Sequence, residues 1–207
     1  MSKVFFMMGM TLDGFIAGPN GGPTNPLGDG GPPIHAWVFE QQAFRSLQKI
    51  ADDGETGDDN RLVEATLART GATILGKRMF DEGEPNWPEE APFHTPVFVL
   101  THEARSPWQR PGGTTFYFVN DGIESALKQA RRVAGNQDVR IGGGAQTVMQ
   151  YLNAGLVDEF TLSIAPHFLG TGSRLFDAID ASKTSLEIVD AVPSRLVTHL
   201  KYSVKRS

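Results

Sequence analysis

The stretch Val139-Arg-Ile-Gly-Gly-Gly-Ala-Gln146 is the most informative part of this sequence. A short strand-like run enters three glycines, and apolar residues at helical spacing follow over positions 145–154. Such a turn exposes backbone N–H groups at a helix N-terminus, where partial positive charge attracts a phosphate and glycine lets it approach. The stretch predicts either a cradle for a dinucleotide pyrophosphate or a structural turn whose glycines allow close packing.

Strands alternate with helices on both sides of this turn. The hydrophobic patterns predict strands at residues 4–11, 72–75, 96–101, 114–119, 139–141 and 159–165, and helices at 36–51, 61–69, 123–134 and 145–154. An antiparallel pair at 186–192 and 195–204 closes the chain. This alternation predicts a single α/β domain over residues 1–207, with a mixed, mostly parallel twisted sheet flanked by helices.

Composition excludes several classes of function. The chain has 207 residues, no cysteine, and 19 basic against 24 acidic side chains, which gives a net charge of −5. Without cysteine there is no disulfide scaffold, thiolate zinc site or cysteine nucleophile. An acidic pI near 5.5 provides no basic field for nucleic acid. The first apolar run is interrupted by Thr11 and Asp13, so we expect a cytoplasmic protein with no membrane segment.

The machinery of hydrolysis and phosphoryl transfer is missing from the sequence. The five histidines show no metal-ligand spacing, so no metal site is expected, and neither a Gly-x-Ser-x-Gly elbow nor a Walker loop occurs. Hydride transfer fits better, because the cofactor carries that chemistry. An ordinary NAD-dependent Rossmann enzyme remains a further hypothesis, although Thr147 occupies the third glycine position of that fingerprint.

A Gly/Pro-rich loop follows the first strand. Six of the 17 residues from 17 to 33 are glycine and five are proline, a composition that excludes a helix or a central strand. Together with the helix after it, this loop forms an insertion at about residues 18–60. We expect residues 18–33 to be a mobile lid over the substrate, with a disordered insertion as the alternative.

Two other predicted strands end in groups that suit a phosphate. Leu75-Gly-Lys-Arg-Met-Phe80 places two cations after a glycine, and Leu100-Thr-His-Glu-Ala-Arg105 supplies a hydroxyl, an imidazole and a guanidinium. Ligands of open α/β sheets bind along this edge of the strands.

Four stretches resemble a known family. They are Thr11-Leu-Asp-Gly-Phe-Ile-Ala17, Ile74-Leu-Gly-Lys-Arg-Met-Phe80, Val139-Arg-Ile-Gly-Gly-Gly144, and Gly155-Leu-Val-Asp-Glu-Phe160 with the segment 165–176. In this order they resemble the dihydrofolate reductase-like superfamily. The greatest similarity is to the C-terminal reductase domain of the riboflavin-biosynthesis deaminase–reductases and their stand-alone bacterial relatives.

The resemblance implies a dihydrofolate reductase-like fold, NADPH as cofactor and a homodimer. It places Gly9, Ile16 and Ala17 at the nicotinamide. It places the adenosine half and its 2′-phosphate against Gly76, Lys77, Arg78, Met79, Leu100, Thr101 and His102. It assigns the pyrophosphate to Ile141, Gly142, Gly143, Gly144, Ala145 and Gln146.

The substrate site is less well defined. Folate reductases place a carboxylate on the helix before the second cofactor strand, to bind the pterin's amidine and aid protonation. Asp59 and Asp13 are the catalytic candidates, with a helix cap and a turn as their respective structural alternatives. Trp37, Trp87 and Phe168 are candidates for the floor beneath a planar substrate.

The predicted function is therefore an NADPH-dependent reductase that transfers hydride to a small heterocyclic or imine-type substrate. Pterin-like compounds and riboflavin-pathway pyrimidine-like compounds are the two substrate classes considered. The alternative is a catalytically idle, NADPH-binding dimeric protein on the same fold.

Overall fold

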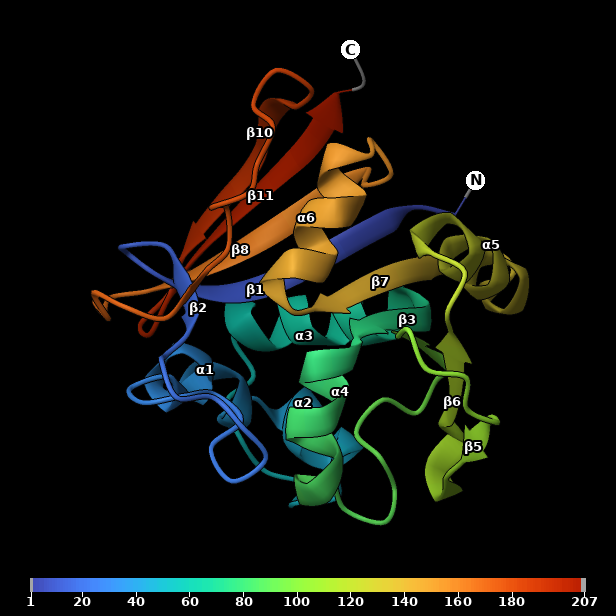
Figure 1. The fold of residues 1–207 in the computed structure, drawn as a ribbon. Coiled ribbons are helices and arrows are strands. Elements are labelled where there is room, and N and C mark those ends of the chain that lie inside the picture. The colour runs from blue at the N-terminus through green and yellow to red at the C-terminus, as the bar shows by residue number, and fades with distance from the viewer. Residues whose placement is uncertain (1, 206–207) are drawn as a thin grey trace.

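A computed structural model describes residues 2–205, which form a central sheet with helices on both faces (Figure 1). The strand order in this sheet is β10-β11-β8-β1-β7-β3-β4-β6-β5. The strands of its parallel part are β1 (Val4–Thr11), β3 (Thr70–Gly76), β4 (Val97–Leu100), β6 (Thr115–Val119), β7 (Asp138–Gly143) and β8 (Glu159–Ala165). Antiparallel neighbours lie at both edges, so the predicted mixed, mostly parallel sheet is confirmed.

The edge strands pair antiparallel. On one side β11 (Thr198–Lys205) pairs with β8, and β10 (Ser185–Pro193) then pairs with β11. On the other side the short β5 (Trp108–Gln109) pairs with β6. A separate two-stranded ribbon joins β2 (Phe15–Ala17) to β9 (Ser173–Arg174), which ties the segment after β1 to the loop after β8.

The helices are α1 (Pro32–Phe39), α2 (Gln42–Leu47), α3 (Asp58–Arg69), α4 (Lys77–Gly83), α5 (Ile123–Ala134) and α6 (Ala145–Asn153), with 3₁₀ turns at Glu84–Asn86 and Pro111–Gly113. In Figure 1, α6 lies in front of the sheet and α3 behind it. The single helix predicted at 36–51 is wrong, because Gln41 is extended. There the backbone N–H of Glu55 donates to the backbone carbonyl of Glu40, and the backbone N–H of Gln42 donates to the backbone carbonyl of Glu55.

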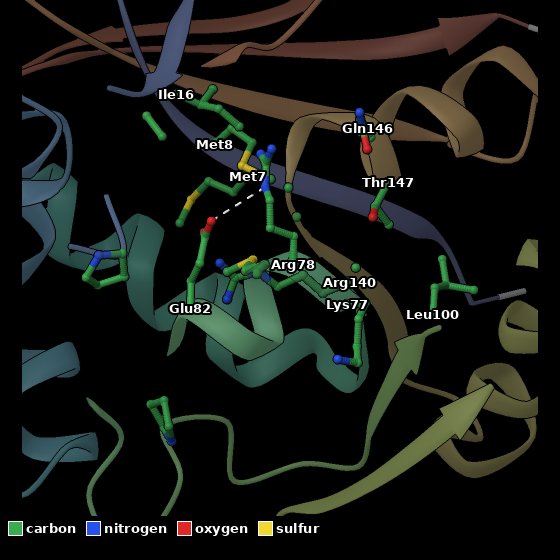
Figure 2. Close-up of a pocket in the computed structure, with 18 of the residues that line it drawn as sticks. Met7, Met8, Ile16, Lys77, Arg78, Glu82, Leu100, Arg140, Gln146 and Thr147 are labelled. Atoms are coloured by element: carbon green, nitrogen blue, oxygen red, sulfur yellow. Dashed lines mark ion pairs between the residues drawn. The ribbon is translucent and has the colours of Figure 1, made fainter. Parts of the chain in front are cut away.

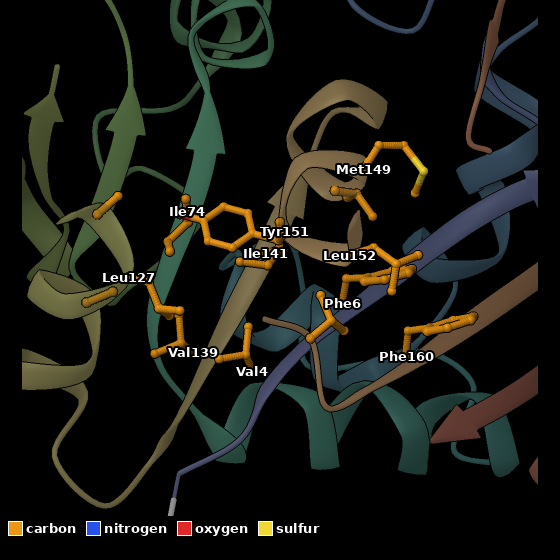
Figure 3. Close-up of a cluster of buried hydrophobic side chains, with 14 of the residues drawn as sticks. Val4, Phe6, Ile74, Leu127, Val139, Ile141, Met149, Tyr151, Leu152 and Phe160 are labelled. Carbon is orange, nitrogen blue, oxygen red and sulfur yellow. The ribbon is translucent and has the colours of Figure 1, made fainter. Parts of the chain in front are cut away.

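The main core lies on the face covered by α5 and α6 (Figure 3). Side chains alternate along β1, so Val4, Phe6 and Met8 point into this core, where Phe6 stacks on Phe160 with ring centroids 4.6 Å apart. The opposite face of the sheet is covered by α1 and α3, and Met7 packs there with Trp37, Val63 and neighbouring apolar side chains. Each strand therefore contributes to two different environments.

The loop at residues 18–31 is folded on itself. The N–H of Gly18 donates to the carbonyl of Leu27 at 2.9 Å, and the N–H of Asp29 donates to that of Pro19 at 2.8 Å. The side-chain amides of Asn20 and Asn25 both donate to the Asp29 carboxylate. These bonds make the segment a structured loop rather than a disordered insertion.

None of the helices within residues 2–205 is long and apolar enough to cross a membrane.

Candidate functional site

A cavity of about 640 Å³ opens where β1, β3, β4 and β7 end (Figure 2). Ligands of open α/β sheets bind at this edge of the strands. Two groups of residues line it. The first comes from the strand ends and α4 and is polar and glycine-rich. The second comes from α1, α2 and α3 and is mostly apolar: Trp37, Val38, Phe44, Leu47, Val63 and Leu67, with Gln48 and Thr66.

The three-glycine turn lies in the first group. Gly144 is the N-cap of α6, and a Cβ added there would meet no heavy atom within 4 Å. Gly143 has a φ of +127°, in the region that favours glycine. Gly76 at the end of β3 packs so closely against the Thr147 hydroxyl that a side chain there would collide with it. The backbone of the turn is thus held close to β3 while the position of Gly144 stays open.

Lys77 and Arg78 at the start of α4 already have carboxylate partners. Lys77 Nζ lies 2.7 Å from both carboxylate oxygens of Asp81, and Arg78 Nε lies 3.6 Å from Glu82, the ion pair that is dashed in Figure 2. The Arg78 side chain is 64% exposed. A phosphate that binds here therefore competes with Asp81 and Glu82 for these cations.

His35 on α1 is a cavity residue that the sequence analysis did not select. Its Nε2–H donates to the carbonyl of Ile16 at 3.3 Å, and burial lowers the pKa of the imidazole. The ring lies against Gly9, where a Cβ would come within 3.1 Å of His35 Nδ1. Its position next to Gly9 and Ile16, two of the three predicted nicotinamide residues, is a tertiary contact between β1, β2 and α1, for which the sequence carries no local signal.

The structure brings most of the predicted cofactor residues together. Those that line the cavity are Gly9, Ile16, Ala17, Gly76, Lys77, Arg78, Met79, Leu100, Thr101, His102, Gly142, Gly143, Gly144 and Gln146. Ile141 and Ala145 do not line it, because both are buried in the main core.

The predicted aromatic floor is only partly assembled. Trp37 lines the cavity. Trp87 instead belongs to a cluster beneath α4, stacked on Phe116 with centroids 5.3 Å apart. Phe168 is 70% exposed and lies outside the cavity lining. The apolar part of the cavity lining comes instead from α1, α2 and α3.

Asp13 lies outside the cavity lining and is held in a turn. Its carboxylate accepts hydrogen bonds from the Thr11 hydroxyl at 2.6 Å and from the backbone N–H groups of Leu169 and Gly170. The Thr11 bond is the largest cause that lowers the pKa of Asp13 to about 2, together with these backbone bonds. This arrangement ties the segment after β1 to the loop after β8. Asp13 therefore has the role in a turn that the sequence analysis gave as the structural alternative.

Asp59 also has a partner away from the cavity lining. His199 Nε2–H on β11 donates to Asp59 at 2.9 Å, and His199 Nδ1 lies 2.9 Å from the Ser163 hydroxyl on β8. All three residues are buried. Gly57 rather than Asp59 is the N-cap of α3, so the helix-cap alternative for Asp59 is wrong. The long-range contact with β11 could not be inferred from the sequence near Asp59.

Arg140 on β7 is a second cavity residue that the sequence analysis did not select. Its Nε atom is buried without a hydrogen-bond partner, and burial lowers the pKa of the guanidinium. Strand alternation could have identified it, because Val139 and Ile141 on either side are core residues and Arg140 must point to the opposite face.

Within residues 2–205, no group of three or more His, Asp or Glu side chains is placed to hold a metal ion.

Comparison with known proteins assigns the family. Residues 2–199 match the protein family described as the RibD C-terminal domain. The chain belongs to this family. The predicted resemblance to the dihydrofolate reductase-like superfamily and to the riboflavin reductase domain is thereby confirmed, and membership supports an oxidoreductase.

Individual relatives are distant. YyaP, an uncharacterized protein of Bacillus subtilis (strain 168), is 26% identical over 178 residues, which cover 84% of this chain and 80% of YyaP. Dihydrofolate reductase from Enterococcus faecalis, solved with NADP(H), matches 98% of this chain and 96% of its own with a TM-score of 0.56 at 16% identity.

A third similar protein is longer than this chain. The diaminohydroxyphosphoribosylaminopyrimidine deaminase/5-amino-6-(5-phosphoribosylamino)uracil reductase of Thermotoga maritima matches over 99% of this chain but 57% of its own length. The TM-score is 0.60 at 13% identity. At such identities the two solved structures show a shared fold.

Proposed function

We propose that this protein is an NADPH-dependent reductase that transfers hydride to a small heterocyclic or imine-type substrate. The substrate classes that we propose are pterin-like and riboflavin-pathway pyrimidine-like compounds. The observation that carries the proposal is the shared cavity, in which a glycine turn at the N-terminus of α6 and an apolar wall from α1–α3 face the same space. One group suits a dinucleotide and the other a planar ring.

The residues present fit the cofactor. In the proposed site, Gly142–Gly144 and Gln146 hold the pyrophosphate, because the turn presents N–H groups and Gly144 leaves open space. Lys77 and Arg78 bind the 2′-phosphate, and Gly9 and Ile16 line the nicotinamide. NADPH supplies the hydride, and the chain supplies position and exclusion of water.

The proposed reduction also requires a residue that donates a proton to the substrate. Asp13 and Asp59 have structural partners, so we assign this task to His35. With its Nε2–H on the Ile16 carbonyl, the neutral ring presents Nδ1 as an acceptor beside Gly9. We propose that Nδ1 takes up a proton from water in the cavity and passes it to a nitrogen of the substrate; the lowered pKa of the imidazole makes its protonated form the stronger acid.

We further propose that the protein is a homodimer in which β10 takes part. Nearly the whole of this edge strand is exposed, including the large apolar side chains of Leu186, Ile188 and Val189. An exposed apolar edge strand is a template for pairing with another chain, and a second copy presents the same edge.

The experiment is a fluorescence titration with NADPH and NADH, followed by NADPH oxidation assays with pterin, pyrimidine and flavin panels. We expect NADPH to bind more tightly than NADH and at least one panel member to be reduced. Failure of both cofactors to bind at millimolar concentration refutes the proposal. NADPH binding without any turnover favours the idle binding protein, an alternative supported by the structural partners of Asp13 and Asp59.

A further inference from the structure

Arg140 carries a charge into the cavity on the face of the sheet covered by α1 and α3. It pairs in register with Phe5 on β1 and with Thr73 on β3, both of which are neutral. Figure 2 shows its side chain among those that line the cavity. A guanidinium remains charged at all physiological pH values, so it cannot avoid the cost of burial by losing its proton.

Within residues 2–205 this charge has no partner. The side chain of Arg140 forms no hydrogen bond or ion pair with the described residues, and its Nε atom is inaccessible to solvent. The carboxylates that line the cavity are Glu82 and Glu103, and they lie 3.6 Å from Arg78 and 3.9 Å from Lys77. The cavity therefore contains one uncompensated positive charge, at Arg140.

The surroundings of Arg140 stabilise its positive charge poorly. On this face of the sheet the cavity lining includes Met7 from β1 and Val63, Thr66 and Leu67 from α3, and these four side chains offer a single hydroxyl among apolar groups. A buried guanidinium N–H without a hydrogen-bond partner carries a desolvation cost. A ligand that brings the opposite charge removes that cost, and the planar guanidinium matches a carboxylate through two parallel N–H donors.

We propose that Arg140 binds a single negative charge of carboxylate type on the substrate. This inference rests on the proposed function, because it names the class of substrate that the reductase takes. A phosphate dianion fits less well, since Arg140 is the one permanent cation among the described cavity residues that lacks a carboxylate neighbour. A cationic amidine is disfavoured, because like charges in a poorly solvated pocket repel.

The experiment compares benzoate, its neutral isostere benzamide, and inorganic phosphate by isothermal titration calorimetry. For the wild-type chain we expect benzoate to bind at least about ten-fold more tightly than benzamide. Arg140→Met should abolish that preference, and Arg140→Lys should retain part of it. Arg131→Met is the matched control, because Arg131 is exposed on α5 and its loss removes the same charge.

Three results would overturn the inference. One is equal binding of benzoate and benzamide by the wild-type chain, and the second is an undiminished benzoate preference in Arg140→Met. The third is binding of phosphate that depends on Arg140, together with no binding of benzoate. Thermal melting supplies a separate check, because removal of an unpaired charge should leave Arg140→Met at least as stable as Arg131→Met. A melting temperature several degrees lower would show that the charge has a partner in the folded chain.

NADPH titration keeps the two proposals apart. We expect Arg140→Met to bind NADPH within about two-fold of wild type, because the proposed phosphate contacts lie on the glycine turn and α4. Loss of NADPH binding by every variant, with the benzoate preference intact, refutes the proposed reductase and leaves the anion site standing. Normal NADPH binding without a preference for benzoate refutes the anion site at Arg140 and leaves the proposed reductase standing.

Discussion

Gly144→Ala tests the cofactor cradle with little disturbance of the fold. The residue has φ −80° and ψ −164°, which any L-residue can adopt, and its Cβ would have no heavy atom within 4 Å. Alanine restricts the unfolded chain, which stabilises by about 0.4–1 kcal/mol, while loss of a glycine N-cap costs a similar amount. We therefore expect the free energy of unfolding to change by less than about 1 kcal/mol.

Binding should respond much more strongly than folding. The new methyl group stands beside the N–H groups that are proposed to hold the pyrophosphate. Loss of one hydrogen bond to a charged group costs about 1.5–3 kcal/mol, so the Kd for NADPH should rise about ten-fold to a hundred-fold. Gly143 is a poorer choice for this test, because its φ of +127° adds backbone strain of about 1–3 kcal/mol to any substitution.

Gly57→Ala is the matched control. Gly57 is the N-cap of α3, has φ −76° and ψ −154°, and also has nothing within 4 Å of an added Cβ, but it does not line the cavity. The assay is fluorescence titration of NADPH with urea unfolding of both variants. If Gly144→Ala folds normally and binds NADPH as tightly as Gly57→Ala does, the glycine turn is structural and the assignment of the pyrophosphate fails.

Three further predictions concern other parts of the molecule. Lys77→Ala/Arg78→Ala should weaken NADPH by about ten-fold or more and NADH by less, and equal loss for both cofactors in titrations would show that the pair does not bind the 2′-phosphate. Replacement of residues 19–31 by a short Gly-Ser linker should preserve NADPH binding but abolish turnover, because Pro26 and Leu27 form a cavity wall; full activity would exclude a lid. Burial would raise the pKa of Glu159, but hydrogen bonds from Lys3 and Arg69 lower it to about 2. Its stabilising effect is therefore complete above about pH 4.5 and disappears as the pH falls towards 2, so Glu159→Gln should destabilise by about 1–2 kcal/mol at pH 7 in urea unfolding and by little near pH 2. A difference between Glu159→Gln and wild type that does not vary with pH would contradict this.

The parallel part of the sheet could be predicted because its strands are buried on both faces. Val97-Phe-Val-Leu100 is a continuous apolar run and Ala72-Thr-Ile-Leu75 is apolar except for the buried Thr73, and the ends of both mark the edge where the cavity lies. Short elements could not be predicted in the same way. The two-residue strand β5 exists because Trp108 pairs with Phe116, and the break between α1 and α2 exists because residues 40–42 bond to Glu55.

The charged residues of the site show the same contrast between positions fixed by local sequence and positions that depend on distant parts of the chain. Lys77 and Arg78 directly follow a strand, so chain connectivity alone brings them to the edge of the sheet. Asp59 is different, because its role depends on His199, which lies 140 residues further along the chain. A carboxylate at a helix start looks the same in sequence whether it faces a ligand or a buried imidazole. Only the register of β11 on β8 places that imidazole beside α3.

The polarity of the cavity distinguishes this chain from the folate reductases that its sequence resembles. Those enzymes bind a cationic amidine through a carboxylate on the helix before the second cofactor strand. Here that helix is α3, which faces the cavity with Val63, Thr66 and Leu67, while its Asp59 is bound to His199. The same face of the sheet presents Arg140 instead. If Arg140 binds substrate as proposed, a guanidinium in place of a carboxylate selects the opposite charge on the ligand. Screening within the proposed heterocycle classes should therefore begin with members that carry a carboxylate.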